Sequence, residues 1–460
     1  MKRLQILKRS MYATLLVTSL SLGGCESFLD EKPDKALAVP TTLSDLQALL
    51  DDYNNMNNDH PAGSAETSAD NYFLPSATWA SMSNEAERRK YTWEKDNLFR
   101  IGYRPNDWYE AYQTIYYANT VLETVPSIER TANNAQTWDY VKGQAHYYRG
   151  LTLLTAASIW AQAYDEQTAG SALGLPLRLG TNFNEKLVRA SIDETYIQIL
   201  QDLKQAAALL PERTTHVMRP SRAAAYAVLA RAMLYMRRYE EAGAYADSTL
   251  MLNDKLLDYN TLSATAAYPL PKFNPEVLHE SMTGAPQPLS TSRARIDTLL
   301  YKSYADDDLR KKLFFKKASD GYYSFKGSYE GSSSLFTGVA TDEVYLILAE
   351  SQARRGDVTS AMATLNTLLR NRWRTGTFTD LEAGSADEAL ALILQERRKE
   401  LLMRGLRWMD IKRLNKEGAN ITLKRVIEDK DYLLPPGDLR FALPIPEDVI
   451  ELSGMQQNPR

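Results

Sequence analysis

The sequence is poor in the residues that metal proteins and many enzymes use as ligands or nucleophiles. It holds one cysteine and four histidines in 460 residues. A single cysteine cannot form a disulfide within the chain, so the fold must rest on its core. No P-loop or Gly-x-Ser-x-Gly pattern occurs, and no zinc-ligand spacing relates the histidines, which are His60, His146, His216 and His279. We therefore expect no metal and no cofactor.

An excess of basic residues is also missing. The chain has 54 Lys and Arg against 58 Asp and Glu, a net charge of −4. Residues 1–24 hold four of the basic residues and no acid, so removing them changes the net charge to −8. Because a protein that binds a duplex needs a basic face to displace counterions, this balance argues against a nucleic-acid partner.

The start of the chain has the pattern of a secretory signal. Basic residues are followed by an apolar stretch from Met11 to Leu22 and by Gly23-Gly24-Cys25. The stretch is shorter than the roughly 20 residues that a membrane-spanning helix needs. The segment before Cys25 resembles the lipobox of bacterial lipoproteins, in which the cysteine is acylated. We therefore expect residues 1–24 to be removed and Cys25 to be the lipid attachment site, anchoring the protein to a membrane; the alternative is a secreted protein with an incidental cysteine.

Most of the remaining sequence shows apolar residues at helical spacing. Ser191 with Glu194 forms a capping-box start, and Ser221 after a proline is a second helix start. We predict helices in the segments Trp108 to Val125, Ala135 to Trp160, Ile192 to Leu210, Ser221 to Leu252, Asp342 to Arg370 and Ala386 to Leu414.

Two of these segments repeat each other at an offset of 119 residues. Tyr226, Ala230, Ala242 and Leu250 recur as Tyr345, Ala349, Ala361 and Leu369. Each copy has a short break in its middle, at 237–239 and 354–356. Small alanines at fixed places let two helices approach closely, which is the packing of tetratricopeptide-type pairs. Two unrelated helical hairpins are the alternative.

The predicted fold is mainly α, with a helix-pair scaffold in residues 107–252 and 341–415. A region rich in Pro, Gly, Ser and aromatics, residues 253–340, separates its two parts and includes a short strand from Tyr322 to Lys326. A second irregular region covers about residues 52–80. Loops of this length are usually functional or disordered.

The chain resembles the SusD/RagB-like family of nutrient-binding outer-membrane lipoproteins along the whole mature region. The start Cys25-Glu-Ser-Phe-Leu-Asp-Glu-Lys-Pro is similar to that family's start, and Arg404 stands where the family commonly has an acid. The pieces that carry the resemblance, in order, are Gly143–Leu151 with Gly174–Leu177, Arg189–Tyr196, Arg222–Arg231, Glu343–Glu350 with Leu365-Asn366 and Arg370–Arg372, Glu396–Arg413, Leu443–Glu447 and Gln457–Pro459.

The resemblance implies one SusD-like domain over residues 25–460, with four tetratricopeptide-type pairs under a variable ligand face. It also implies a location at the outer membrane and a partner, a TonB-dependent (SusC-like) barrel. Members bind oligosaccharides, or peptides in the RagB branch, and are not enzymes.

For the ligand face we expect aromatic rings and planar polar groups on the two irregular regions, since flat sugar faces pack on such rings. The candidate ligand-binding residues are Asn71, Tyr72, Trp79, Tyr268, Tyr322 and Tyr323. Burial in the core is the alternative for each of them.

Two charged motifs have structural interpretations. Asp306-Asp307-Asp308 could ligate calcium, but acids at a solvated helix start explain it more simply. Glu400 and Arg404 are spaced for an i,i+4 pair in a helix that serves as a structural clamp.

The sequence thus predicts a surface protein that captures a glycan for a transporter and performs no chemistry. Peptide capture, a helical scaffold for a protein partner and a glycosidase with a paired Asp or Glu remain alternatives.

Overall fold

The computed structural model describes residues 40–99 and 106–460. The expected signal peptide and Cys25 lie outside the described residues. Among the described helices, none is both long and apolar enough to cross a membrane.

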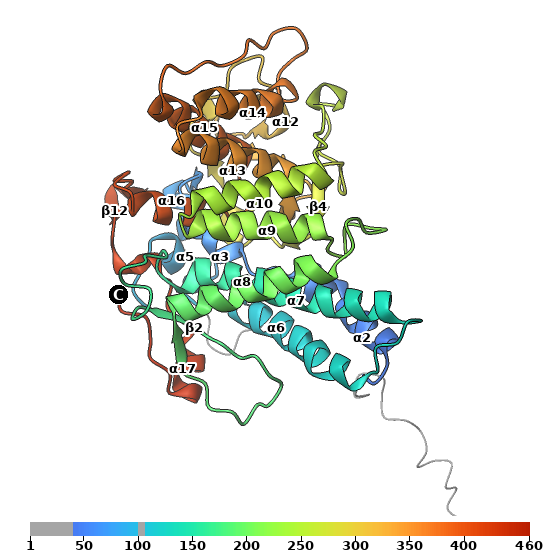
Figure 1. The fold of residues 1–460 in the computed structure, drawn as a ribbon. Coiled ribbons are helices and arrows are strands. Elements are labelled where there is room, and N and C mark those ends of the chain that lie inside the picture. The colour runs from blue at the N-terminus through green and yellow to red at the C-terminus, as the bar shows by residue number, and fades with distance from the viewer. Residues whose placement is uncertain (1–39, 100–105) are drawn as a thin grey trace, which may run out of the picture. The chain divides into compact units, whose positions relative to one another are not determined.

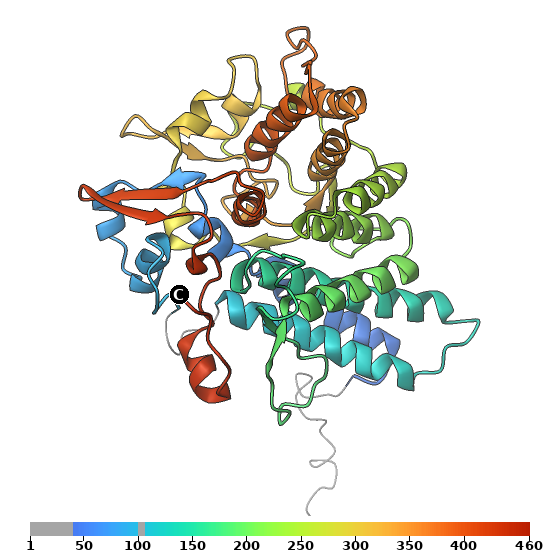
Figure 2. The same ribbon diagram turned by 60° about the vertical axis from the view of Figure 1, so that its left-hand side comes forward.

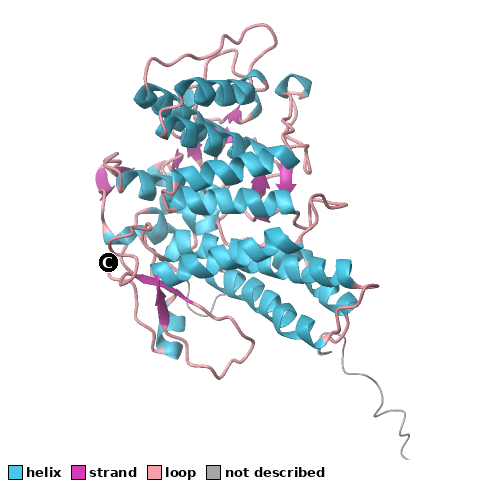
Figure 3. Ribbon diagram, in the orientation of Figure 1, coloured by secondary structure: helices cyan, strands magenta, loops and turns pink. Residues whose placement is uncertain are grey.

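The scaffold is a stack of antiparallel helices in which neighbours pack against each other (Figures 1 and 3). It rises from α6 at the bottom of Figure 1 to α14 and α15 at the top. Five of the six predicted helical segments are confirmed, two of them as pairs of helices, and the sixth is confirmed except in its middle. The scaffold helices are α6 (Asp107–Thr124), α7 (Ala135–Trp160), α8 (Ile192–Leu209), α9 (Arg222–Tyr235), α10 (Tyr239–Leu252), α13 (Thr341–Arg354), α14 (Val358–Arg370), α15 (Ala386–Glu400) and α16 (Arg407–Asn415).

Polar caps fix where several of these helices begin. The Ser191 side chain accepts a hydrogen bond from the Glu194 amide, and the Glu194 carboxylate accepts one from the Ser191 amide, which confirms the capping box. The Ser221 hydroxyl accepts from the Ala224 amide at 3.2 Å. Such a cap satisfies backbone donors that the first turn leaves free.

The internal repeat is confirmed by the helix boundaries. α9 and α13, and then α10 and α14, begin at positions that differ by 119 residues. The break in each copy contains one residue with positive φ, Arg237 at 60° and Gly356 at 84°, again at the same offset. α10 packs directly on α13, and a Cβ added to Gly243 would lie 2.9 Å from the Ser351 Cβ. The two pairs are therefore stacked copies, although residues 253–340 separate them in the chain.

The insert, residues 253–340, consists of short elements joined by loops. In Figure 2 it is the yellow to gold part at the upper left, beside the helical stack. Its strands pair with each other, apart from β6, which pairs with β1 near the start of the chain. The elements of this face are β1 (Tyr72–Phe73), β4 (Val277–His279), β5 (Met282–Thr283), β6 (Arg295–Ile296), α11 (Thr298–Lys302), α12 (Arg310–Leu313), β7 (Phe315–Lys317), β8 (Tyr323–Phe325), β9 (Leu335–Phe336) and β10 (Val339–Ala340).

A few elements lie outside both the scaffold and the insert. β2 (Leu173–Pro176) pairs with β3 (Arg189–Ser191), and β11 (Leu423–Ile427) forms a hairpin with β12 (Lys430–Leu434), followed by α17 (Glu447–Ser453). Apolar side chains gather in a large core among the scaffold helices and in a second, aromatic-rich core inside the insert.

The first irregular region is more ordered than the sequence predicted. Residues 52–80 form the π-helix η3 (Asn54–Asn58), α3 (Gly63–Ser68), β1 and α4 (Ser76–Ala80), and residues 61–69 are all buried. Small side chains make this packing close, since a Cβ added to Gly405 would lie 2.8 Å from the Ala62 Cβ. Alanines and serines that resemble a loop in the sequence therefore form part of the core.

The predicted helix from Ala386 to Leu414 is wrong in its middle. α15 ends at Glu400 and α16 begins at Arg407, and the link between them contains positive φ at Met403 (61°) and Gly405 (75°). Because the chain turns there, Glu400 and Arg404 do not form the expected i,i+4 pair.

The close contact between α10 and α13 can be tested at Gly243. We expect Gly243→Leu to lower the free energy of unfolding by about 1–3 kcal/mol, because the new side chain overlaps Ser351. Chemical denaturation measures the change. Gly170→Leu is the matched control, since nothing lies within 4 Å of a Cβ there; similar losses in both variants would contradict the close contact.

Candidate functional site

The insert and the neighbouring strand β1 carry two pairs of aromatic rings, Tyr301 with Tyr323 and Phe73 with Tyr322, here together called the aromatic ledge. The Tyr301 and Tyr323 rings stack with centroids 3.7 Å apart and planes inclined by 14°. Tyr322, which is 42% exposed, meets Phe73 edge to face at 5.0 Å. The ledge therefore offers ring surfaces to solvent on a supported hairpin.

Local pairing holds the ledge in place. β7 pairs with β8 so that Phe315 lies opposite Phe325, and both rings are buried in the insert core. β1 pairs with β6, which places Phe73 beside Arg295. The Arg295 Nε lies 2.7 Å from the Asp320 Oδ2 and so ties the turn of the hairpin to β6.

Next to the ledge the insert has a small pocket, here called the serine pocket. It is lined by Tyr268, Leu289, Thr291, Phe325, Lys326, Ser328, Ser332, Ser333 and Leu335. Hydroxyl groups, aromatic rings and one ammonium group thus meet in one hollow. Among these described lining residues there is no Asp, Glu or His.

The structure brings three of the six predicted ligand residues to this face. Tyr268 lines the serine pocket, while Tyr322 and Tyr323 belong to the ledge. The ledge also contains Phe73 and Tyr301, which the sequence analysis missed. For Phe73 a signal existed: in a strand, neighbouring side chains point to opposite faces, so a buried Tyr72 leaves Phe73 facing out.

The other three predicted residues lie away from this surface. Asn71 and Tyr72 are each 1% exposed, so neither offers a ligand direct contact. The Asn71 Nδ2 donates to the Glu66 Oε1 at 3.0 Å, and the Tyr72 hydroxyl donates to the Thr67 carbonyl at 2.9 Å. Trp79 is half-buried, and its Nε1 donates to the Arg88 carbonyl.

Behind the insert lies a buried network of ion pairs centred on Arg372. Its Nε lies 2.7 Å from the Glu400 Oε1 and its Nη2 lies 2.7 Å from the Glu276 Oε1, and all three side chains are fully buried. The Arg372 Nη1 donates to the Leu257 carbonyl. One guanidinium thus joins the end of α14, the end of α15 and the insert.

The network continues through Arg310, which is also fully buried. Arg310 pairs with Asp308 at 2.8 Å, with Glu396 at 2.6 Å and with Glu400 at 2.9 Å. Although burial opposes ionisation, Arg310 and then Lys399 hold the pKa of Asp308 below its ordinary value. Charge-assisted bonds of this kind stabilise carboxylates that could not otherwise remain ionised in the core.

The acids of the triple Asp motif have different partners. Asp306 pairs with Lys311, Asp307 pairs with Arg374, and Asp308 enters the buried network. They do not converge on a common point. The interpretation as a solvated helix start is also wrong for Asp308, which is fully buried.

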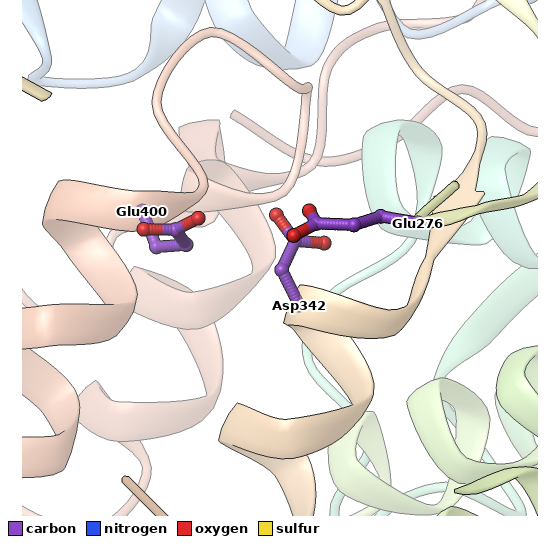
Figure 4. A group of neighbouring side chains, drawn as sticks. All are labelled: Glu276, Asp342 and Glu400. Carbon is purple, nitrogen blue, oxygen red and sulfur yellow. The ribbon is translucent and has the colours of Figure 1, made fainter. Parts of the chain in front are cut away.

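Three buried carboxylates of the network come close together in Figure 4. Glu276, Asp342 and Glu400 each offer an oxygen within 4.8 Å of the others, an arrangement that could surround a metal ion. Three arginines balance their charge, because Arg310, Arg372 and Arg404 each pair with at least one of them.

Glu276 is the acid of this cluster that contacts both Arg372 and Tyr329. Burial, only partly offset by Arg372, raises the pKa of Glu276 to about 7. The Tyr329 hydroxyl donates to the Glu276 carboxylate. The ion pairs therefore account for the buried acids, and the cluster serves to connect elements.

Two neutral histidines lie at the junction between the insert and the scaffold. Burial lowers the pKa of His60 and of His279 to about 3. His279, at the end of β4, packs against the rings of Tyr147 and Tyr148. The His60 Nε2 contacts the Thr155 hydroxyl at 3.2 Å, beside a hollow of about 280 Å³ that Arg231 also lines.

Fold and surface together define a helical-repeat protein that presents a loop-rich aromatic face. Two family models match the chain, one described as "Starch-binding associating with outer membrane" over residues 27–234 and one described as "SusD family" over residues 312–460. The chain therefore belongs to the SusD/RagB-like family, and the resemblance seen in the sequence is confirmed.

Solved structures share the fold at low sequence identity. A SusD superfamily protein from Bacteroides thetaiotaomicron is 22% identical with a TM-score of 0.74, over 91% of this chain and 100% of that one. A SusD-like carbohydrate binding protein from Bacteroides vulgatus is 20% identical with a TM-score of 0.67, over 90% and 97%. A laminarin binding SusD-like protein is 18% identical with a TM-score of 0.65, also over 90% and 97%. A comparison with curated protein sequences found no match.

The buried network can be tested by removing its central cation. We expect Arg372→Met to lower the free energy of unfolding by about 3–5 kcal/mol, because Glu276 and Glu400 are left buried without their partner. Arg370→Met is the matched control two residues away, where the pair with Asp380 is about half exposed and contributes about 0–1 kcal/mol. Equal losses in urea unfolding would contradict the role of Arg372.

The junction histidines predict how stability depends on pH. His279 has a folded pKa of about 3 against an ordinary 6.5, so its contribution is complete above pH 6.5 and is lost as the pH falls toward 3. Between pH 7 and pH 5 this loss is about 2 kcal/mol for one histidine. We expect His279→Gln to flatten the fall in stability by this amount, while His216→Gln on the surface leaves the slope unchanged. An unaltered slope in the His279 variant would exclude the effect.

Proposed function

We propose that the protein is a surface glycan-binding protein of the outer membrane, anchored through a lipid on Cys25. It captures an oligosaccharide and delivers it to a TonB-dependent (SusC-like) barrel, without changing the ligand chemically. The observation that carries this proposal is the aromatic ledge beside a hydroxyl-lined pocket.

The ledge suits a sugar for physical reasons. Sugar rings have flat C–H faces that pack on aromatic rings, and stacked or edge-to-face tyrosines are rigid and lose little entropy on binding. The serine pocket supplies hydroxyl groups of Thr291, Ser328, Ser332 and Ser333 for hydrogen bonds. The first matching family is described as starch-binding, and one of the similar structures is a laminarin-binding protein; both favour the same ligand class.

The positions of the acids support a protein that binds a glycan without changing it chemically. A glycosidase needs two carboxyl groups that reach the scissile bond from a shared cleft. Among the described residues, the clustered acids Glu276, Asp342 and Glu400 are buried and paired with arginines. A ligand on the ledge does not reach them.

The test is the affinity for glycans of variants in the ledge. We expect Tyr322→Ala and Tyr323→Ala each to weaken binding of the preferred oligosaccharide about tenfold, which corresponds to ~1.4 kcal/mol, because each removes a ring face. Isothermal titration against a panel that includes laminarin oligosaccharides measures this, and protection from thermal unfolding identifies the ligand.

The matched control is Phe183→Ala, because Phe183 is an aromatic residue 72% exposed on a different loop. It should leave the affinity unchanged. Binding of peptides instead of glycans, with the same dependence on Tyr322 and Tyr323, would replace the glycan by a peptide ligand. Equal affinity in all three variants would exclude the ledge as the binding site.

A further inference from the structure

The ledge has an unusual electrostatic setting for a chain with net negative charge. Its rim carries four exposed lysines, and among the described residues no carboxylate forms an ion pair with any of them. These are Lys302, Lys312, Lys316 and Lys317. By contrast, Lys311 on the same rim pairs with Asp306 at 2.8 Å. The acid–base balance of this surface therefore differs from that of the whole sequence, which has more acids than bases.

Strand register places one of these lysines beside a tyrosine of the stack. Lys317 on β7 lies directly opposite Tyr323 on β8. Opposed residues of an antiparallel pair have their side chains on the same face as close neighbours. Tyr323 stacks on Tyr301, and the Lys311 Nζ lies 5.6 Å from the centroid of the Tyr301 ring. Each of the two stacked rings therefore has a lysine as a neighbour, Lys317 beside Tyr323 and Lys311 near Tyr301.

Lys316 lies on the other face of the β7–β8 hairpin. Lys316 lies opposite Ser324, so its side chain starts from the face opposite to that of Lys317. There it approaches Lys326 of the serine pocket: burial, and then the charge of Lys316, lower the pKa of Lys326. The Lys326 Nζ donates to the carbonyls of Ala264 and Ala266 and has no carboxylate partner among the described residues.

The acids near the ledge do not neutralise these charges. Asp320 is held by Arg295 at 2.7 Å and Asp306 by Lys311. The Asp297 carboxylate accepts from the Leu300 amide and lies 3.9 Å from Arg398. Each acid thus already has a donor or cation, whereas the lysines on both faces of the β7–β8 hairpin have no anion.

We propose that the ligand is an anionic oligosaccharide, whose carboxylate or sulfate groups pair with Lys317 beside the tyrosine stack and with Lys316 on the pocket side of the hairpin, while its sugar rings pack on the tyrosines. This inference rests on the proposed function and narrows its ligand class. Exposed ion pairs are individually weak and are screened by salt. Several along one chain raise the affinity together and make it depend steeply on ionic strength.

The experiment compares acidic and neutral forms of the same sugar chain. Oligogalacturonate is titrated against the protein beside the same oligosaccharide after methyl esterification, which removes its charge. A chondroitin sulfate oligosaccharide is compared with its desulfated form, which keeps its uronate carboxylates. This second comparison tests the added effect of sulfate groups. At a low salt concentration of about 20 mM, we expect an acidic form to bind at least tenfold more tightly than its less charged counterpart. This advantage should be lost at about 1 M salt.

The variant K316Q/K317Q separates the lysines from the rings. It should lose the tenfold advantage for the acidic form and keep the affinity for the neutral form. K95Q/K204Q is the matched control, because it makes the same change in net charge at two exposed lysines outside the insert. A similar loss in this control would mean that the effect comes from net charge, and would overturn the proposal.

The remaining outcomes distinguish this inference from the proposed function. If neutral glycans bind as tightly as acidic ones, and Tyr323→Ala still weakens them, the anionic ligand is excluded while glycan binding at the ledge stands. If an acidic glycan binds but K316Q/K317Q has no effect, the lysines are excluded as its partners. If no glycan binds in either form, both proposals fail.

Discussion

The pairing of Arg372 with Glu276 and Glu400 is the interaction on which the arrangement of this protein depends. Glu276 belongs to the insert, Arg372 follows α14, and Glu400 ends α15. Burying a charge is costly unless its partners are well placed, so removing one member of such a pair is far more destabilising than the net gain from forming it. The network therefore favours the one placement of the insert on the scaffold in which Arg372 meets both Glu276 and Glu400.

The cost of burying an unpaired charge also explains why the arginines and the lysines have different roles. Carboxylates at the centre of the molecule are matched with arginines, whose planar group donates to two acids at once. Lysines gather on the insert at exposed positions, where a flexible ammonium group remains hydrated. Arg310 and Lys317 are only seven residues apart in sequence, yet one is fully buried among three acids and the other is exposed on β7. The buried charge of Arg310 and the exposed charge of Lys317 thus lie on two adjacent short elements, α12 and β7.

Much of the scaffold could be predicted from the sequence because its signals are local. Helical spacing and the Ser191 capping box depend on neighbouring positions, and the offset of 119 residues repeats such a local pattern; the structure confirms all three. The break after Glu400 was missed, since positive φ at Met403 is imposed by tertiary contacts, among them the pair between Arg404 and Asp342. The site was predicted only in part for the same reason: Tyr72 and Phe73 look alike in sequence, and only pairing with β6 decides which ring is buried.

The stacked repeats explain how a long insert can be attached without disturbing the scaffold. α10 packs directly on α13, so the insert leaves the stack and returns to it at neighbouring points. The entropy of closing such a loop grows only slowly with its length, so residues 253–340 can change in length with little effect on the stack. What the insert must keep is the contact at its base, through Glu276, Tyr329 and the start of α13 at Asp342. Beyond that base its outer strands are free to present rings and lysines to a ligand, which is where a binding surface can diverge most readily on a constant scaffold.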